Sequence, residues 1–193
     1  MARRVLRERG KAIVEEAQGL IEQALAPTSE QTAYKLFRTK DGDISELYPL
    51  FVGANESVPL NQWVAAQSGE LTPGGKVKST LGPLAYRPGW HAGDMPVATH
   101  IGGKSSPDVK QPDFRPADQV WAEVSMADDV DWQSVADANA QISKTTGLPV
   151  ARTAQITDQV PYGGFYRYKT NPNMTGNWLI GGDMKVNRVL SSD

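Results

Sequence analysis

Both histidines of the chain fall in one short stretch, residues 82–103, which reads GPLAYRPGWHAGDMPVATHIGG. An imidazole transfers protons near neutral pH and is a common metal ligand. His91 and Asp94 are close enough in sequence to share a metal ion, and His100 would add a third ligand. Metal motifs with fixed spacing, such as HExxH, do not occur in the sequence. The stretch is therefore a candidate site for proton transfer or ligand binding, and no metal is assigned to it.

Glycine and proline recur throughout this stretch and fix its backbone shape. We expect a short strand at 84–86, a tight corner at 87–89, and then Trp90 and His91 on an edge. Asp94 is expected to cap a short helix with Pro96 in its first turn. A rigid concave wall of this kind is typical of a ligand site. The alternative is a well-packed corner with no chemical role.

Other catalytic motifs are weak or absent. The GxSxG elbow of serine hydrolases does not occur, and GGKSS at 102–106 has the residues of a phosphate loop without its spacing. The chain has no cysteine, which excludes disulfides, thiolate catalysis and cysteine zinc sites. Residues 165–169, FYRYK, interleave aromatic and basic side chains. They either stack on nucleic-acid bases or form a strand with one buried face.

The composition is that of a single globular domain, with 193 residues, 39% hydrophobic and 22% charged. A net charge of −2 does not favour nucleic acid as a partner. No apolar run reaches the roughly 20 residues that span a bilayer. The basic N-terminus leads into an amphipathic pattern rather than a signal-peptide core. We therefore expect neither a transmembrane segment nor a signal peptide.

Residues 2–26 predict a long amphipathic helix that Pro27 ends. Its apolar stripe consists of Leu6, Ile13, Val14, Ala17, Leu20, Ile21 and Ala24. Basic residues crowd its start and acidic residues its end, which opposes the helix dipole. That charge pattern indicates either an acidic partner or a solvated polar face. The stripe packs on the domain or docks into a neighbour's groove, so we expect 2–26 to contact a protein partner or a larger assembly.

A strand-rich domain is expected to follow, over residues 34–193. Alternating side chains predict strands at 34–38, 47–52, 119–126, 150–156 and 161–168, and a closing hairpin from 177–181 and 184–190. Asp41 and Gly42 mark a turn after the first strand. Helices are predicted at 58–67 and 128–144. This pattern predicts an α+β fold: a mixed, mostly antiparallel split sheet with short helices, preceded by the long N-terminal helix.

Three segments together resemble the ADP-ribosyltransferase superfamily. They are an arginine-ended first strand (34–38), a glycine-aromatic corner leading into a short helix (89–98), and the late strand NWLIGGDMKVNRVL (177–190). Their order is also similar to domains embedded in large polyvalent proteins of bacteriophages and mobile elements. The resemblance covers about residues 34–190. It implies NAD as the cofactor and mono-ADP-ribosyl transfer to a host protein as the reaction.

The resemblance also implies roles for individual residues. Arg38 would hold the ribose or phosphate of NAD. Trp90 and His91, with Tyr86 behind them, would form the wall against the nicotinamide. The position where the family has a glutamate falls on Asn177, which would orient the ribose.

An asparagine has no charge, so Asn177 cannot stabilise an oxocarbenium-like transition state as a carboxylate does. A replacement acid would be Asp183 or Glu123, and the implied catalytic set is Arg38, His91 and Asp183. Two functions stay open. The chain is either an ADP-ribosyltransferase or a non-catalytic virion or assembly protein docked through residues 2–26. The expected location is a phage virion or the host cytoplasm.

Overall fold

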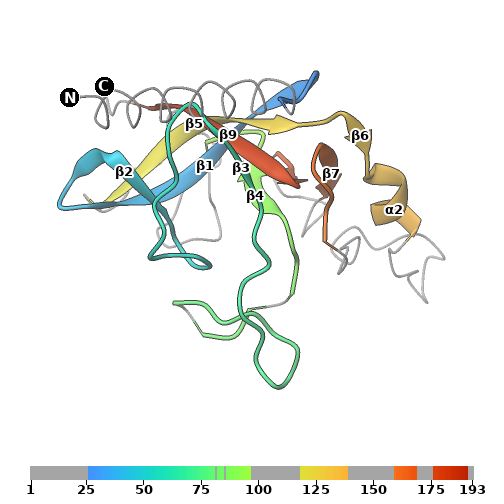
Figure 1. Cartoon of the computed structure of the whole chain (residues 1–193), viewed down its shortest axis with the longest axis horizontal. Helices are drawn as coiled ribbons and strands as arrows, with labels where there is room; N and C mark the ends of the chain where they lie inside the picture. The colour runs from blue at the N-terminus through green and yellow to red at the C-terminus, as the bar shows by residue number, and fades with distance from the viewer. Residues whose placement is uncertain are drawn as a thin grey trace, which may run out of the picture.

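The computed structural model describes residues 26–80, 82–84, 86–96, 118–138, 159–168 and 176–190 (Figure 1). Strand accounts for 50% of these residues and helix for 5%. The predicted α+β class is therefore wrong, because the described part of the chain is mostly β and forms one sheet. No long helix occurs within the described ranges, and the α-helix that they contain is the six-residue α2 (Gln133–Ala138).

The sheet has nine strands among the described residues: eight follow the order β3-β9-β5-β1-β4-β8-β7-β6, and β2 pairs with β1 off this path. They are β1 (Glu30–Lys40), β2 (Asp43–Pro49), β3 (Trp63–Ala65), β4 (Trp90–Gly93), β5 (Gln119–Ala127), β6 (Val130–Asp131), β7 (Gly164–Tyr168), β8 (Trp178–Gly181) and β9 (Asp183–Val189). The pairings are antiparallel, apart from the parallel pair β6 and β7. Because β6 follows directly after β5 in the chain, the sheet curves so that its β6 end returns to β5.

The antiparallel pair β1 and β5 is the centre of the sheet, and the strands predicted at 34–38 and 119–126 are confirmed. Successive side chains of a strand point to opposite faces. Ala33 and Phe37 of β1 are fully buried in the main core. Leu36 points to the other face and packs on Trp121 of β5 in a second cluster. Both faces of β1 are thus covered, which fixes its register.

The turn predicted at Asp41 and Gly42 is confirmed as the hairpin between β1 and β2. Both residues have positive φ angles, 56° and 77°. This left-handed conformation suits the twist of a two-residue hairpin and is tolerated best by Gly, Asn and Asp. β2 pairs only with the C-terminal half of β1, from Phe37 onward.

The closing hairpin predicted from 177–181 and 184–190 is wrong, although both strands exist. β8 pairs with β4 and β7, whereas β9 pairs with β5 and β3. At Gly182 the chain crosses from one part of the sheet to another. A Cβ at Gly182 would lie 1.8 Å from the carbonyl oxygen of Pro161, so the crossing has no room for a side chain. Sequence alternation shows that strands are present but does not show which strands they pair with.

The helix predicted at 58–67 is also wrong. Val58 and Leu60 form single bridges to Leu47 and Val186, and Trp63–Ala65 forms β3 against β9. Asn61 has a φ of 59°, which is incompatible with a right-handed helix. Tertiary pairing with the edge of β9 overrides a weak helical pattern.

The helix predicted at 128–144 begins later than expected. β6 occupies Val130–Asp131, and α2 starts at Gln133, whose backbone N–H donates to Oδ1 of Asp131 (2.8 Å). Figure 1 shows α2 at one end of the molecule, beyond β6. Its buried Ala136 packs in a third cluster with Tyr166 and Ile180.

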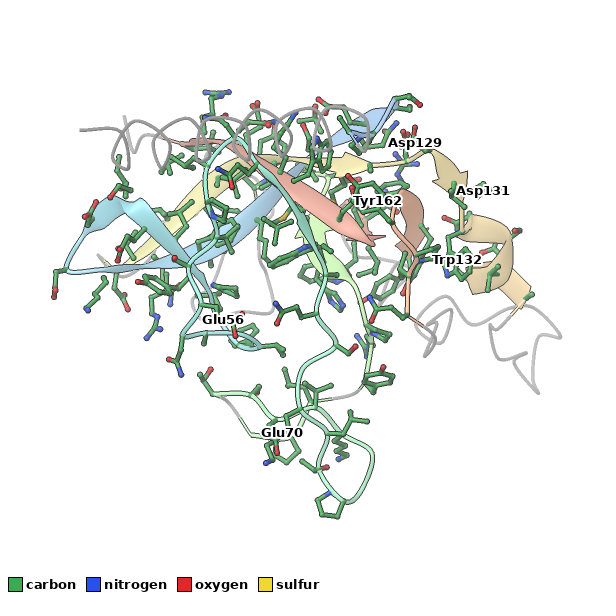
Figure 2. The ribbon with its side chains drawn as sticks, in the orientation of Figure 1. Glu56, Glu70, Asp129, Asp131, Trp132 and Tyr162 are labelled. Atoms are coloured by element: carbon green, nitrogen blue, oxygen red, sulfur yellow. The ribbon has the colours of Figure 1, made fainter. Side chains whose placement is uncertain are left out.

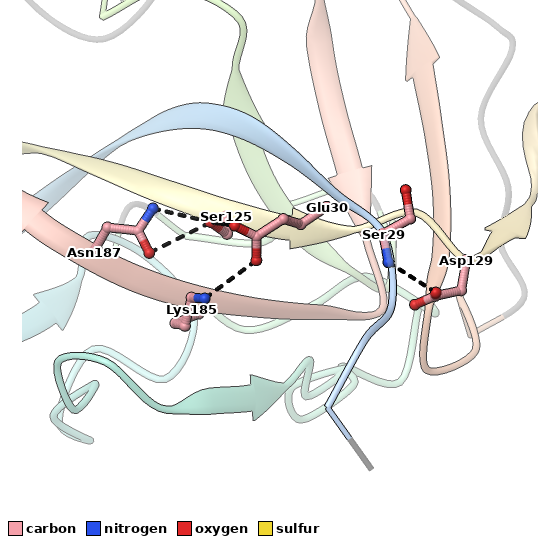
Figure 3. A network of polar contacts seen from close by, with 6 residues as sticks. All are labelled: Ser29, Glu30, Ser125, Asp129, Lys185 and Asn187. Atoms are coloured by element: carbon pink, nitrogen blue, oxygen red, sulfur yellow. Dashed lines mark hydrogen bonds and ion pairs between the residues drawn. The ribbon is translucent and has the colours of Figure 1, made fainter. Parts of the chain in front are cut away.

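A network of polar contacts ties the start of β1 to β5 and β9 (Figure 3). Glu30 accepts bonds from Ser125 Oγ (3.0 Å) and Lys185 Nζ (3.1 Å), and Asn187 Nδ2 donates to Ser125 Oγ (2.9 Å). Beside it, Asp129 accepts the backbone N–H of Ser29 (3.0 Å). These bonds anchor the chain four residues before the first strand predicted from the sequence.

Several predictions lie outside the described residues. They are most of the helix at 2–26, the strand at 150–156, the later part of the helix at 128–144, the helix after Asp94, and His100. Within the described residues, no helix combines the length and apolar character needed to cross a bilayer.

Candidate ligand pocket at the split of β1

A pocket of about 620 Å³ lies where β1 changes its partner. β1 pairs with β4 at Tyr34 and with β2 from Phe37 onward, so the change falls at Lys35 and Leu36. These two side chains point to opposite faces of β1, and both line the pocket. The pocket therefore lies beside the part of β1 between its pairing with β4 and its pairing with β2. Its volume falls within the usual range for small-molecule sites, about 300–1,000 Å³.

The wall of the pocket combines aromatic rings, cations and two carboxylates. Its charged and aromatic members, His91 included, are Tyr34, Lys35, Phe51, Glu56, Glu70, Arg87, Trp90, His91, Trp121 and Trp178. Glu56 and Glu70 are exposed and come from the long segment that extends away from the sheet (Figure 2). Glu70 forms an ion pair with Lys78. Glu56 forms no ion pair with any described residue.

Lys35 is the cation of the inner wall. Its Nζ donates to the carbonyl oxygen of His91 (2.8 Å) and lies 5.4 Å from the ring centre of Trp90 and 5.7 Å from that of Phe37. These contacts are favourable cation–π geometries. Burial nevertheless lowers the pKa of the Lys35 ammonium to about 8, because the charge is removed from water without a carboxylate beside it.

His91 lines the same pocket and is neutral at physiological pH. Burial lowers its pKa to about 4, and the charges of Lys35 and Arg87 act in the same direction, while a backbone hydrogen bond opposes them. Its Nε2 lies 3.0 Å from the carbonyl oxygen of Arg87. A carbonyl only accepts, so Nε2 carries the proton and Nδ1 is the acceptor. His91 is thus a poor electrostatic anchor for an anion but a suitable neutral acceptor.

Trp90 and Arg87 complete this side of the pocket. Trp90 Nε1 donates to the carbonyl oxygen of Val64 (2.7 Å), which fixes the indole ring. Arg87 Nη1 donates to the hydroxyl of Tyr168 (3.1 Å). Arg87 Nε and Trp178 Nε1 are buried donors that have no acceptor among the described residues. Buried donors are normally paired, so these two nitrogens are exceptions among the described residues.

The sequence-predicted site residues separate into two groups. Trp90 and His91 line the pocket together. Arg38 and Tyr86 do not line it. Arg38 Nη2 donates to the carbonyl oxygen of Ala54 (2.8 Å), and its guanidinium lies 5.9 Å from the ring centre of Tyr48. Arg38 therefore anchors the loop after β2, and Lys35 takes the place at the pocket.

Asn177 also lies outside the pocket lining. Its backbone N–H and its Nδ2 donate to the two carboxylate oxygens of Asp94, both at 2.8 Å. Asp94 N–H donates back to the carbonyl oxygen of Asn177 (3.2 Å). This reciprocal clamp holds the end of β4 against the start of β8 and gives both side chains a positioning role.

The two proposed replacement acids lie on other parts of the sheet. Asp183 is fully buried, and its Oδ1 accepts the backbone N–H of Gly163 (2.6 Å). Burial raises the pKa of its carboxyl, and its Oδ2 has no hydrogen-bond partner among the described residues. Glu123 accepts a bond from Arg188 Nη2 (2.7 Å). Neither residue lines the pocket.

Sequence reasoning missed Lys35, Arg87, Glu56 and Glu70. A signal for Lys35 was present, because in an alternating strand it shares the face of Ala33 and Phe37, which are both core residues. A charged residue in phase with a core face is a candidate functional group. The two glutamates carry no such signal, since they lie in irregular segments.

No three of His, Cys, Asp and Glu come together as a metal set within the described ranges. No family model matches the chain, and neither a curated protein nor a solved structure does.

Proposed function

We propose that this chain is a nucleotide-binding domain of the ADP-ribosyltransferase-like class, with an NAD-type dinucleotide held in the pocket at the split of β1. The observation that carries the proposal is that Lys35, Arg87 and Trp90 share one pocket wall. Cations suit the pyrophosphate, and indole rings suit the flat bases.

The proposed roles differ from those that position alone implied. Lys35 and Arg87 would hold the phosphates instead of Arg38. Trp90 would be the wall for a base, as the resemblance implied. Transfer of ADP-ribose also needs a carboxylate near the developing positive charge. Glu56 is our candidate, because it lines the pocket and forms no ion pair with a described residue.

Binding is tested by titrating the protein with NAD up to millimolar concentrations and following heat and tryptophan fluorescence. A charge-assisted hydrogen bond contributes about 1.5–3 kcal/mol, so we expect Lys35→Met to weaken NAD binding by roughly 10- to 100-fold. Lys185→Met is the control, since Lys185 lies outside the pocket. The absence of NAD binding to the unmodified chain would refute the proposal.

Turnover is tested separately by release of nicotinamide. We expect Glu56→Gln to lower the rate by about 100-fold or more, as loss of a group that stabilises charge in the transition state does. Glu70→Gln is the matched control, because Glu70 also lines the pocket but is paired with Lys78. Equal rates for the two variants would exclude Glu56 from the reaction.

Attachment through residues 2–26 stays a prediction, as do a bacteriophage source and a location in the virion or the host cytoplasm. An assembly role would appear as a large species on size exclusion of the full chain. Placing a charge in the apolar stripe, for example by Ile13→Glu, should then remove that species. An unchanged elution profile would count against docking through this segment.

A further inference from the structure

Lys35 is an amine that faces a pocket without a carboxylate counter-ion. Among the described residues, its Nζ donates to the backbone carbonyl of His91 and lies near two aromatic rings, those of Trp90 and Phe37. No described acidic residue lies within ion-pair distance of its Nζ. The groups that face it, His91 and Arg87, are neutral and positive respectively. The carbonyl oxygen and the two rings favour the ammonium, but no described carboxylate lies close enough to pair with it.

Lys185 provides an internal comparison. Its Nζ also lies over an indole ring, 4.9 Å from the centre of Trp63. Unlike Lys35, it forms an ion pair with Glu30 at 3.1 Å. Each lysine thus lies over an indole ring of its own. Lys185 has a carboxylate partner and lies outside the pocket, whereas Lys35 lines the pocket and has no described carboxylate partner.

We infer that Lys35 Nζ is a nucleophile that condenses with the carbonyl carbon of an aldehyde-bearing ligand in the pocket, forming a reversible imine. The nitrogen lone pair attacks the carbonyl carbon, and the C–N bond forms as the C=O π bond opens. The carbinolamine oxygen then leaves as water, taking up the two protons that the nitrogen loses. No oxidant or reductant takes part. This activity goes beyond nucleotide binding and does not depend on NAD as the ligand.

The surroundings favour this chemistry at neutral pH. A neutral amine is required for the attack. With a pKa of about 8, about a tenth of Lys35 is neutral at pH 7, compared with about 0.03% of an amine at the ordinary value of 10.5. The pocket also defines the ligand class. Its aromatic wall suits a flat ring, and Arg87 suits an anionic group.

Pyridoxal 5′-phosphate is a suitable probe, because it combines a ring, an aldehyde and a phosphate. The full chain is incubated with one equivalent of pyridoxal 5′-phosphate at pH 7, and the imine is reduced with borohydride. The number of adducts is measured by intact mass spectrometry, and their positions are found by peptide mapping. We expect labelling of Lys35 to be roughly 100-fold faster than labelling of Lys185. Any terminal amine also reacts near this pH, so the site is assigned from the peptides. Label spread evenly over the surface lysines would overturn the inference.

Variants separate chemistry from folding. Lys35→Arg keeps a cation in the pocket but cannot form an imine, and it should lose the Lys35 adduct while staying folded. Lys185→Met should keep that adduct. An unchanged adduct pattern in Lys35→Arg would also refute the inference. NAD titration stays independent: an adduct without NAD binding rejects only the proposed function, and NAD binding without an adduct at Lys35 rejects only the imine.

Discussion

Replacing Lys35 by methionine should change how the stability of the protein depends on pH. Methionine has a similar length and no charge, so it fills the same space between Phe37 and Trp90. In the native protein, burial lowers the pKa of the lysine from its ordinary value of 10.5 to about 8. The buried ammonium therefore destabilises the folded state at every pH at which Lys35 is still protonated in that state.

The magnitude follows from linkage. Between pH 8 and 10.5 the unfolded chain keeps a proton on Lys35 that the folded chain releases, so the unfolded state binds more protons and stability rises with pH. At about 1.36 kcal/mol per pKa unit, the full difference corresponds to about 3 kcal/mol. The cost is fully present below pH 8 and disappears as the pH approaches 10.5. The stability of Lys35→Met should not rise over this pH range, because methionine has no proton to release.

Guanidinium unfolding followed by tryptophan fluorescence, at intervals from pH 6 to 10.5, measures this difference. We expect the stability of Lys35→Met minus that of the native chain to fall by up to about 3 kcal/mol across pH 8–10.5. Lys185→Met controls for removing a lysine elsewhere on the sheet. A difference that stays flat with pH, or the same fall in the Lys185→Met control, would refute the reasoning that Lys35 is a desolvated cation.

Three further substitutions test other parts of the structure. Burial lowers the pKa of His91 from 6.5 to about 4, so the native chain should lose up to about 3 kcal/mol of stability as the pH falls through that window. His91→Gln should lose much less when guanidinium unfolding is repeated from pH 6.5 down to pH 4. Burial raises the pKa of the Asp183 carboxyl above 3.8, so the ionised carboxylate opposes folding. Asp183→Asn should therefore be more stable than the native chain at pH 7, and this advantage should shrink toward pH 4. An unchanged melting temperature at pH 7 would contradict this. Gly182→Ala should cost at least about 2 kcal/mol because its Cβ meets a backbone carbonyl, whereas Gly74→Ala, whose Cβ has its nearest neighbour at 3.9 Å, should stay within about 0.5 kcal/mol.

The strands with strong alternation were predictable from the sequence. The side chains of β1 and β5 alternate between two faces as the pleat requires, and both faces are largely covered. The turn at Asp41 and Gly42 was predictable for the same local reason, because few residues accept positive φ. Pairing partners were not predictable, since alternation says which face a residue takes but not which strand lies beside it.

The site was predictable only in part. Trp90 and His91 were found because a dense glycine and proline pattern marks a fixed corner, and both line the pocket. Arg38 was preferred to Lys35 because position in a family pattern was followed rather than the phase of the strand. Arg38 lies three residues after Lys35, so its side chain points to the opposite face of β1. There it bonds to the carbonyl oxygen of Ala54 and does not line the pocket. Glu56 enters the wall only through the path of a long irregular segment.

The central place of β1 has a consequence for how the molecule is made. β1 is the first described strand, yet its main neighbour, β5, is not made until much later, and β5 is completed by β9 near the end of the chain. To form a contact between distant segments, the chain must first lose the entropy of closing a large loop, and this slows folding. During synthesis the early strands would have to wait with open edges for most of translation. We therefore expect the sheet to fold cooperatively, and only after β9 has been synthesised. Deleting β9 should prevent the whole sheet from folding rather than remove one edge strand.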